Sequence, residues 1–133
     1  MLLSGQKIMA KARPLSPHLS VWRFQLPAVM SILHRATGVA LSTGTVLIAG
    51  WLIALAAGEE AFALASVIMA HPLAQLVLFG YSVVLFYHMC NGIRHLSWDW
   101  GYGLNIPAIY LTGRITVAAA VLLTAGLWLY LYL

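Results

Sequence analysis

The chain has 133 residues, of which 62% are hydrophobic and only 8% are charged. Since soluble domains carry about 25% charged residues, this composition excludes a water-exposed globular surface, and the low polarity excludes a disordered chain. The formal net charge is +4, but the basic residues form no stripe along the sequence, so nucleic-acid binding is not indicated either. We expect one all-α membrane domain over residues 1–133, whose length allows three or four spanning helices.

Cysteine and acidic residues are too few for several kinds of site. Cys90 is the single cysteine, so neither a disulfide nor a cysteine-ligated iron–sulfur cluster can form within the chain. The acidic residues are Glu59, Glu60 and Asp99. This argues against catalysis by a carboxylate pair and against a carboxylate cage for a hard metal ion.

Residues 1–27 form a mixed N-terminal segment that carries Lys7, Lys11, Arg13 and Arg23. The segment lacks the long apolar core and the small-residue cleavage site of a secretory signal. Because basic residues gather on the cytoplasmic or matrix side of membrane proteins, we expect this segment on that side.

Three apolar runs have the length of membrane spans. A helix needs about 20 apolar residues to cross a bilayer, and residues 28–56, 73–96 and 108–131 meet this requirement. Residues 61–70 are too few to cross and predict an interfacial helix. Three spans put the termini on opposite sides, with the connection after the second span on the inner side and the Glu59–Glu60 turn on the outer side.

Polar residues inside the predicted spans form two clusters, and charged groups in a bilayer mark sites by default. The first cluster, residues 31–38, reads SILHRATG. Ser31 and Arg35 lie four residues apart and share a helix face, with His34 on an adjacent stripe.

The second cluster, residues 88–95, reads HMCNGIRH. His88 and His95 are seven residues apart, which places them within about 20° on a helix and about 10 Å apart along its axis. Gly92 follows His88 by one turn and leaves room for a flat object. A deep neutral imidazole suits iron, and shallower cations suit the propionates of a haem. The alternative is a buried histidine that hydrogen-bonds to a neighbouring helix.

Three segments together resemble the family of succinate dehydrogenase cytochrome b556 subunits, the larger of the two membrane anchors of respiratory complex II. They read RPLSPHL at 13–19, SILHRATG at 31–38 and HMCNGIRHLSWDWG at 88–101. The order of the segments and the three spans also agree with this family.

The resemblance implies roles for six residues. His88 would be an axial ligand of haem b, whose second ligand is a histidine of the other anchor subunit. His34, Arg35 and His95 would lie near the haem propionates. Ser31 and Arg35 would line a ubiquinone pocket with Phe24 at its mouth, where mitochondrial relatives have a tryptophan and therefore an indole N–H donor.

The resemblance also implies partners and a location. The chain would be a non-catalytic anchor in succinate:ubiquinone oxidoreductase, together with a second anchor, an iron–sulfur subunit that delivers electrons, and a flavoprotein. We expect the bacterial cytoplasmic membrane with a cytoplasmic N-terminus, rather than the mitochondrial inner membrane.

Two other functions compete with this interpretation. One is a small transporter or proton relay through His88 and His95, and the other is a structural anchor without haem. For the neighbouring charges, we expect Arg94 to be an inner-side or subunit-contact residue. We expect Asp99 to pair with Arg94 or His95, or to contact the iron–sulfur subunit.

Overall fold

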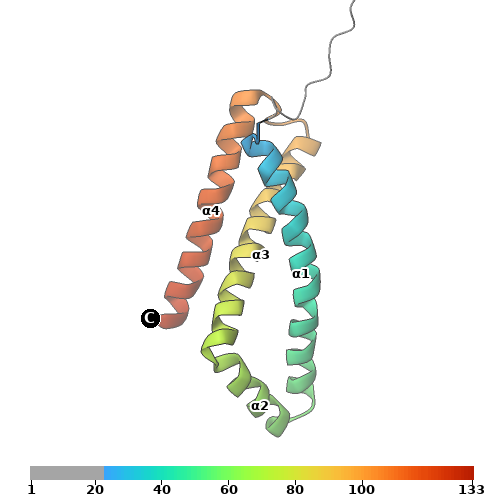
Figure 1. Cartoon of the computed structure of the whole chain (residues 1–133), viewed down its shortest axis with the longest axis vertical. Helices are drawn as coiled ribbons and strands as arrows, with labels where there is room; N and C mark the ends of the chain where they lie inside the picture. The colour runs from blue at the N-terminus through green and yellow to red at the C-terminus, as the bar shows by residue number, and fades with distance from the viewer. Residues whose placement is uncertain (1–22) are drawn as a thin grey trace, which may run out of the picture.

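A computed structural model describes residues 23–133 as four α-helices in a simple order (Figure 1). Residues 1–22, with Lys7, Lys11, Arg13 and the segment 13–19, lie outside the described residues. The helices are α1 (Leu26–Ala56), α2 (Glu59–Ala70), α3 (Pro72–Asp99) and α4 (Ile106–Tyr132). The predicted all-α fold class is confirmed for the described part of the chain, which contains no strand.

Helices α1, α3 and α4 are each long and apolar enough to cross a membrane. Their bounds lie within three residues of the predicted spans. Helix α2 has 12 residues, and its length of about 18 Å at 1.5 Å per residue is too short to cross the hydrocarbon core.

The helix starts follow from local chemistry. A proline occupies the first turn of α1, α3 and α4, where its missing N–H leaves no intrahelical bond unmade. His71 caps α3, because its Nδ1 accepts a hydrogen bond from the backbone N–H of Leu73 at 3.2 Å. Asn105 caps α4 through Oδ1, which accepts from the N–H of Ala108 at 2.9 Å.

Helix α3 is the central element, with α1 and α4 packed against it (Figure 1). Helix α2 closes the end of the bundle where α1 ends and α3 begins (Figure 1). At the opposite end, the start of α1, the end of α3 and the start of α4 come together (Figure 1). The two predicted polar clusters both lie toward this second end, which we call the histidine end.

Small residues let the helices approach closely at two points. A Cβ on Gly44 of α1 would overlap the ring of Tyr81 of α3, whose hydroxyl donates to the carbonyl of Leu41 at 3.3 Å. A Cβ on Gly113 of α4 would lie 2.9 Å from Sδ of Met30 in α1. Both contacts therefore require glycine, as is common where membrane helices pack.

The interior of the described chain is unusually polar. Its buried hydrophobic residues are Met30 and Ala120, whereas the buried polar ones are Ser82, Asn91, Arg94, Thr116 and Thr124. Large apolar side chains instead cover the outside of all three long helices. This is the pattern of a membrane protein, in which hydrogen bonds and close packing join the helices and apolar surface faces lipid or other subunits.

Candidate functional site

The histidine end brings three imidazole rings into one stack. The ring of His34 on α1 lies 4.0 Å from that of His88 on α3, measured between centroids, with the planes 12° apart. It also lies 5.0 Å from the ring of His95, with the planes 17° apart. Since His88 and His95 are about two turns apart on one face of α3, these spacings fit a His34 ring that lies between them.

His88 is held from α1 by a residue that sequence reasoning did not single out. Its Nδ1 lies 3.0 Å from the hydroxyl oxygen of Thr37. That hydroxyl is also 2.8 Å from the carbonyl oxygen of Leu33 and 2.9 Å from that of His34. Within residues 23–133, no hydrogen bond engages Nε2 of His88. In the sequence, Thr37 could be noted only as a polar residue one turn after His34. That this side of α1 meets α3 is known from the structure.

Gly38 is the second residue that the sequence reasoning did not assign. A Cβ at Gly38 would lie 3.2 Å from Cε1 of His88, so a larger residue would press on the ring. Gly92, which was predicted to leave room for a flat object one turn after His88, faces the ring of His34. A Cβ on Gly92 would lie 3.9 Å from Cε1 of His34. The glycine that permits the observed position of His88 is therefore on the neighbouring helix.

Arg94 makes several contacts at the histidine end, all with residues of this chain. It is 5% exposed, and its guanidinium donates to Oγ1 of Thr112 at 3.1 Å, to the carbonyl of Ile109 at 3.0 Å and to Oδ1 of Asn91 at 3.3 Å. It also lies 4.0 Å above the ring of Trp98. Arg94 is thus the cation that joins α3 to α4.

This position of Arg94 corrects two sequence expectations. Arg94 was expected as an inner-side or subunit-contact residue, whereas its guanidinium is committed to contacts between α3 and α4 within this chain. The expected pairing of Asp99 with Arg94 or His95 is not formed among the described residues, where Asp99 is exposed. The physical reason is that uncharged acceptors from α4 reach the guanidinium first. The alternative contact of Asp99 with another subunit stays a prediction.

Three buried polar atoms near the stack have no hydrogen-bond partner in the described part of the chain. They are Nδ1 of His34, Nδ2 of Asn91 and Nε1 of Trp98. All three residues surround His95, whose ring stacks on His34, contacts Trp98 edge-on at 5.0 Å and hydrogen-bonds through Nδ1 to the carbonyl of Asn91 at 2.7 Å. Buried atoms of this kind are rare in proteins and call for an explanation such as a bound polar ligand.

Ser31, Arg35 and Phe24 lie on the outer side of this cluster. Ser31 is partly buried, whereas Arg35 and Phe24 are exposed. Among residues 23–133, neither the Ser31 hydroxyl nor the Arg35 guanidinium takes part in a hydrogen bond or ion pair. Both are therefore available to a molecule or subunit that approaches α1 from outside, and the back-bond that serine commonly makes to its own helix is not formed.

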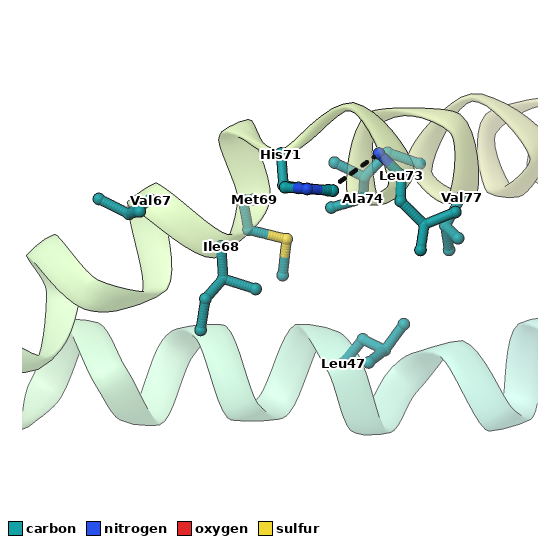
Figure 2. A pocket seen from close by; sticks show the side chains of 9 residues that line it. Leu47, Val67, Ile68, Met69, His71, Leu73, Ala74 and Val77 are labelled. Atoms are coloured by element: carbon teal, nitrogen blue, oxygen red, sulfur yellow. Dashed lines mark hydrogen bonds between the residues drawn. The ribbon is translucent and has the colours of Figure 1, made fainter.

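A sizeable hollow lies at the other end. It measures about 580 Å³ and sits between α1 and the junction of α2 with α3, as Figure 2 shows. Apolar side chains form nearly all of its wall. Its one polar side chain is His71, whose Nδ1 is occupied by the cap to Leu73 (Figure 2). The hollow therefore lacks the set of donors and cations that the histidine end provides.

The described residues contain no cluster of three or more histidine, cysteine or acidic side chains that could hold a metal ion unaided. Within the stack, Nε2 of His88 has no hydrogen-bond partner among residues 23–133. An iron centre here would need its other ligands from a macrocycle and from another chain.

Comparisons with known proteins all match the chain to membrane subunits of one enzyme complex. The sequence profile described as "Succinate dehydrogenase/Fumarate reductase transmembrane subunit" matches residues 9–127. The chain is similar to the succinate dehydrogenase cytochrome b556 subunit of Rickettsia felis, with 42% identity over 128 residues that cover 96% of this chain and 99% of that one.

Two further relatives extend this similarity. The cytochrome b556 subunit of Paracoccus denitrificans is 43% identical over 111 residues, which cover 84% of this chain and 85% of the relative. The mitochondrial cytochrome b560 subunit of succinate dehydrogenase from Homo sapiens is 39% identical over 123 residues, which cover 91% of this chain and 73% of the relative. The match thus includes the whole histidine end.

Proposed function

Since this chain belongs to the family of succinate dehydrogenase/fumarate reductase transmembrane subunits, we propose that it binds haem b and forms part of a ubiquinone-reduction site in complex II. In this role the chain is one membrane-anchor domain and is not catalytic on its own. The observation that carries the proposal is His88, a partly buried histidine within a spanning helix, with its Nδ1 held by Thr37 and its Nε2 without a partner among the described residues.

The residues present fit a haem. Histidine ligands of metals commonly use one ring nitrogen for the metal and the other for a hydrogen bond, and His88 has this arrangement. Haem b would supply a one-electron centre held by His88 and by a histidine of the second anchor subunit. Gly38 keeps the space beside the His88 ring open, since a side chain there would collide with it.

We assign the two haem carboxylates to the cationic and N–H groups around the stack. The unpaired Nδ1 of His34 supports this assignment, because a buried ring nitrogen gains a partner when an anion binds nearby. His95 and Arg35 would add donors on either side. Charge-assisted hydrogen bonds of this type are about twice as strong as neutral ones.

Ser31 and Arg35 would form this chain's part of the ubiquinone site, with Phe24 at its mouth. A quinone oxygen gains negative charge as it is reduced, so a positioned hydroxyl donor and a fixed guanidinium stabilise the reduced species. The uncommitted state of both side chains in the described structure supports this assignment. Phe24 offers an apolar ring for stacking and no N–H donor.

The proposed partners are a second anchor subunit, an iron–sulfur subunit that passes electrons to the quinone, and a flavoprotein that oxidises succinate outside the bilayer. We assign the histidine end to the cytoplasmic side of a bacterial inner membrane, because the basic N-terminal segment precedes α1 on that side. The exposed apolar surface of the helices supports contact with lipid and with the second anchor.

A proton relay through the histidines is less well supported. The stacked rings occupy one end of the bundle, whereas Glu59 and Glu60 begin α2 at the other end and Asp99 ends α3. A relay across the bilayer needs titratable groups along its path. None of the chain's acidic residues lies between the stack and α2.

The axial role of His88 is tested by the reduced-minus-oxidised visible spectrum of membranes that carry the assembled complex. His88→Leu should abolish the b-type signal while the subunits still co-purify. A full b-type signal from this variant would refute the axial assignment and favour the haem-free anchor.

The quinone site is tested by two activities of the same complex. Ser31→Ala and Arg35→Ala should lower ubiquinone reduction at least tenfold, because each removes a donor to the reacting oxygen. Succinate-dependent reduction of an artificial dye at the flavoprotein should persist. An equal loss of both activities would contradict the assignment and indicate failed assembly.

A further inference from the structure

The Thr37 hydroxyl and Nδ1 of His88 form one hydrogen bond, in which either group can be the donor. A threonine hydroxyl has one hydrogen and two lone pairs, and a neutral imidazole carries one N–H. At the 3.0 Å contact, the hydrogen can therefore come from Oγ1 of Thr37 or from Nδ1 of His88. The choice matters because it decides which nitrogen of His88 has a free lone pair.

The surroundings of Thr37 favour one choice. If its hydroxyl donates to the carbonyl of Leu33 at 2.8 Å or of His34 at 2.9 Å, its lone pair can accept from Nδ1–H of His88, and both hydrogens are used. If the hydroxyl donates to Nδ1 instead, the proton of His88 moves to Nε2. No described residue accepts a hydrogen bond there.

The first arrangement thus makes one more hydrogen bond inside a helix long and apolar enough to span a membrane, where an unsatisfied donor is costly. Other hydroxyls of the bundle behave in the same way. Ser42, Thr43, Thr45, Thr112 and Thr124 all donate to a carbonyl three or four residues earlier on their own helix.

We propose that Thr37 is a positioning residue that fixes the tautomer of His88, with the proton on Nδ1 and a free lone pair on Nε2. The inference rests on the proposed axial role of His88. Only a nitrogen with a free lone pair can bind iron, so Thr37 prepares the ligand before haem arrives. Gly38 and the stacked ring of His34 hold the ring in the orientation that Thr37 requires.

The same hydrogen bond has an electronic consequence. A ligand histidine that donates from its second nitrogen becomes more basic and gives more charge to the metal. More charge on the metal favours the ferric over the ferrous state. Loss of the Thr37 hydroxyl should therefore raise the midpoint potential of the haem and weaken its binding.

The test uses the purified complex with Thr37→Val, Thr37→Ala and Thr37→Ser. Valine has the shape of threonine without its hydroxyl, alanine removes the hydroxyl with less bulk, and serine keeps the hydroxyl. Thr43→Val is the matched control, because the exposed Thr43 bonds only to the carbonyl of Ala40. The measurements are haem content per complex after detergent washing and the midpoint potential from a spectroscopic redox titration.

We expect Thr37→Val and Thr37→Ala to lower haem affinity about 10- to 100-fold and to shift the potential upward. Thr37→Ser and Thr43→Val should match the wild type. Wild-type haem content and potential in both hydroxyl-free variants would overturn the role of Thr37. That result differs from failure of the proposed function, in which His88→Leu itself would retain the b-type signal.

Discussion

The two ends of the bundle each place a histidine beside a neighbouring donor or acceptor, with opposite consequences. At the α2 end, Nδ1 of His71 accepts from the backbone N–H of Leu73, which can only donate. The neutral ring must then carry its proton on Nε2. At the histidine end, the Thr37 hydroxyl can accept from Nδ1 of His88, which leaves Nε2 free.

The partner of the ring therefore decides what each histidine can do. His71 completes a helix start and has no free lone pair for a metal, although it borders an apolar hollow of about 580 Å³. His88 instead presents a ring nitrogen, Nε2, that has no partner among the described residues.

The largest expected difference between the ends is in haem content. His88→Leu should remove the b-type absorption entirely, whereas His71→Leu should leave it at the wild-type level, since His71 only caps α3. The difference spectra of the two purified variants measure this directly. If His71→Leu also lost the signal without loss of assembly, the contrast between the ends would be wrong.

The next largest effect should come from Arg94, which holds the histidine end together. Arg94→Leu removes three hydrogen bonds and leaves acceptors of Asn91 and Thr112 unpaired. At about 0.6 kcal/mol for an average hydrogen bond between membrane helices, we expect a loss of about 2 kcal/mol. The measurement is the temperature at which the purified complex loses its haem signal.

Arg94→Lys is the matched variant for this prediction. It keeps the charge but lacks the planar fork that reaches Thr112, Ile109 and Asn91 together. We expect an intermediate loss of stability. Full stability in both variants would show that the packing of α3 on α4 does not depend on the guanidinium.

Much of this fold was predictable from composition, and parts of the site were not. Apolar runs and prolines predicted the three long helices, because the thickness of the bilayer sets the length of a spanning helix. The spacing of His88 and His95 gave their common face on α3. Contacts between residues of different helices were harder to predict, since nothing in the sequence near His88 tells which side chain of α1 contacts it.

Thr37 and Arg94 illustrate this limit. Thr37 was part of a recognised segment, but its role depends on a 3.0 Å contact across 51 residues of sequence. Arg94 was expected as an inner-side or subunit-contact residue, yet it is buried and bonds to acceptors of α4 in the same chain. Local pattern gives the face of a helix, whereas the pairing of faces comes from tertiary packing.

An effect of about the same size as that of Arg94→Leu is expected at Gly44, in the middle of the bundle between the two ends. Gly44→Ala places a methyl group against the ring of Tyr81 and should cost about 1–3 kcal/mol through overpacking. Gly50→Ala is the control on the same helix, because a Cβ there meets nothing within 4 Å. Thermal stability of the two complexes distinguishes them, and equal stability would argue against the close contact of α1 with α3.

The smallest effect should come from a single interhelical hydrogen bond on the side of the bundle away from the histidine stack. Trp128 of α4 donates from Nε1 to the hydroxyl of Ser82 in α3 at 2.9 Å, and its ring packs edge-on against Phe79. Trp128→Phe keeps an aromatic ring but removes the donor, so we expect a loss of about 1 kcal/mol or less. Haem content and midpoint potential should not change, because the contact is remote from His88. A change in either quantity would mean that the two ends are coupled through α3 and that the histidine end does not depend on its local contacts alone.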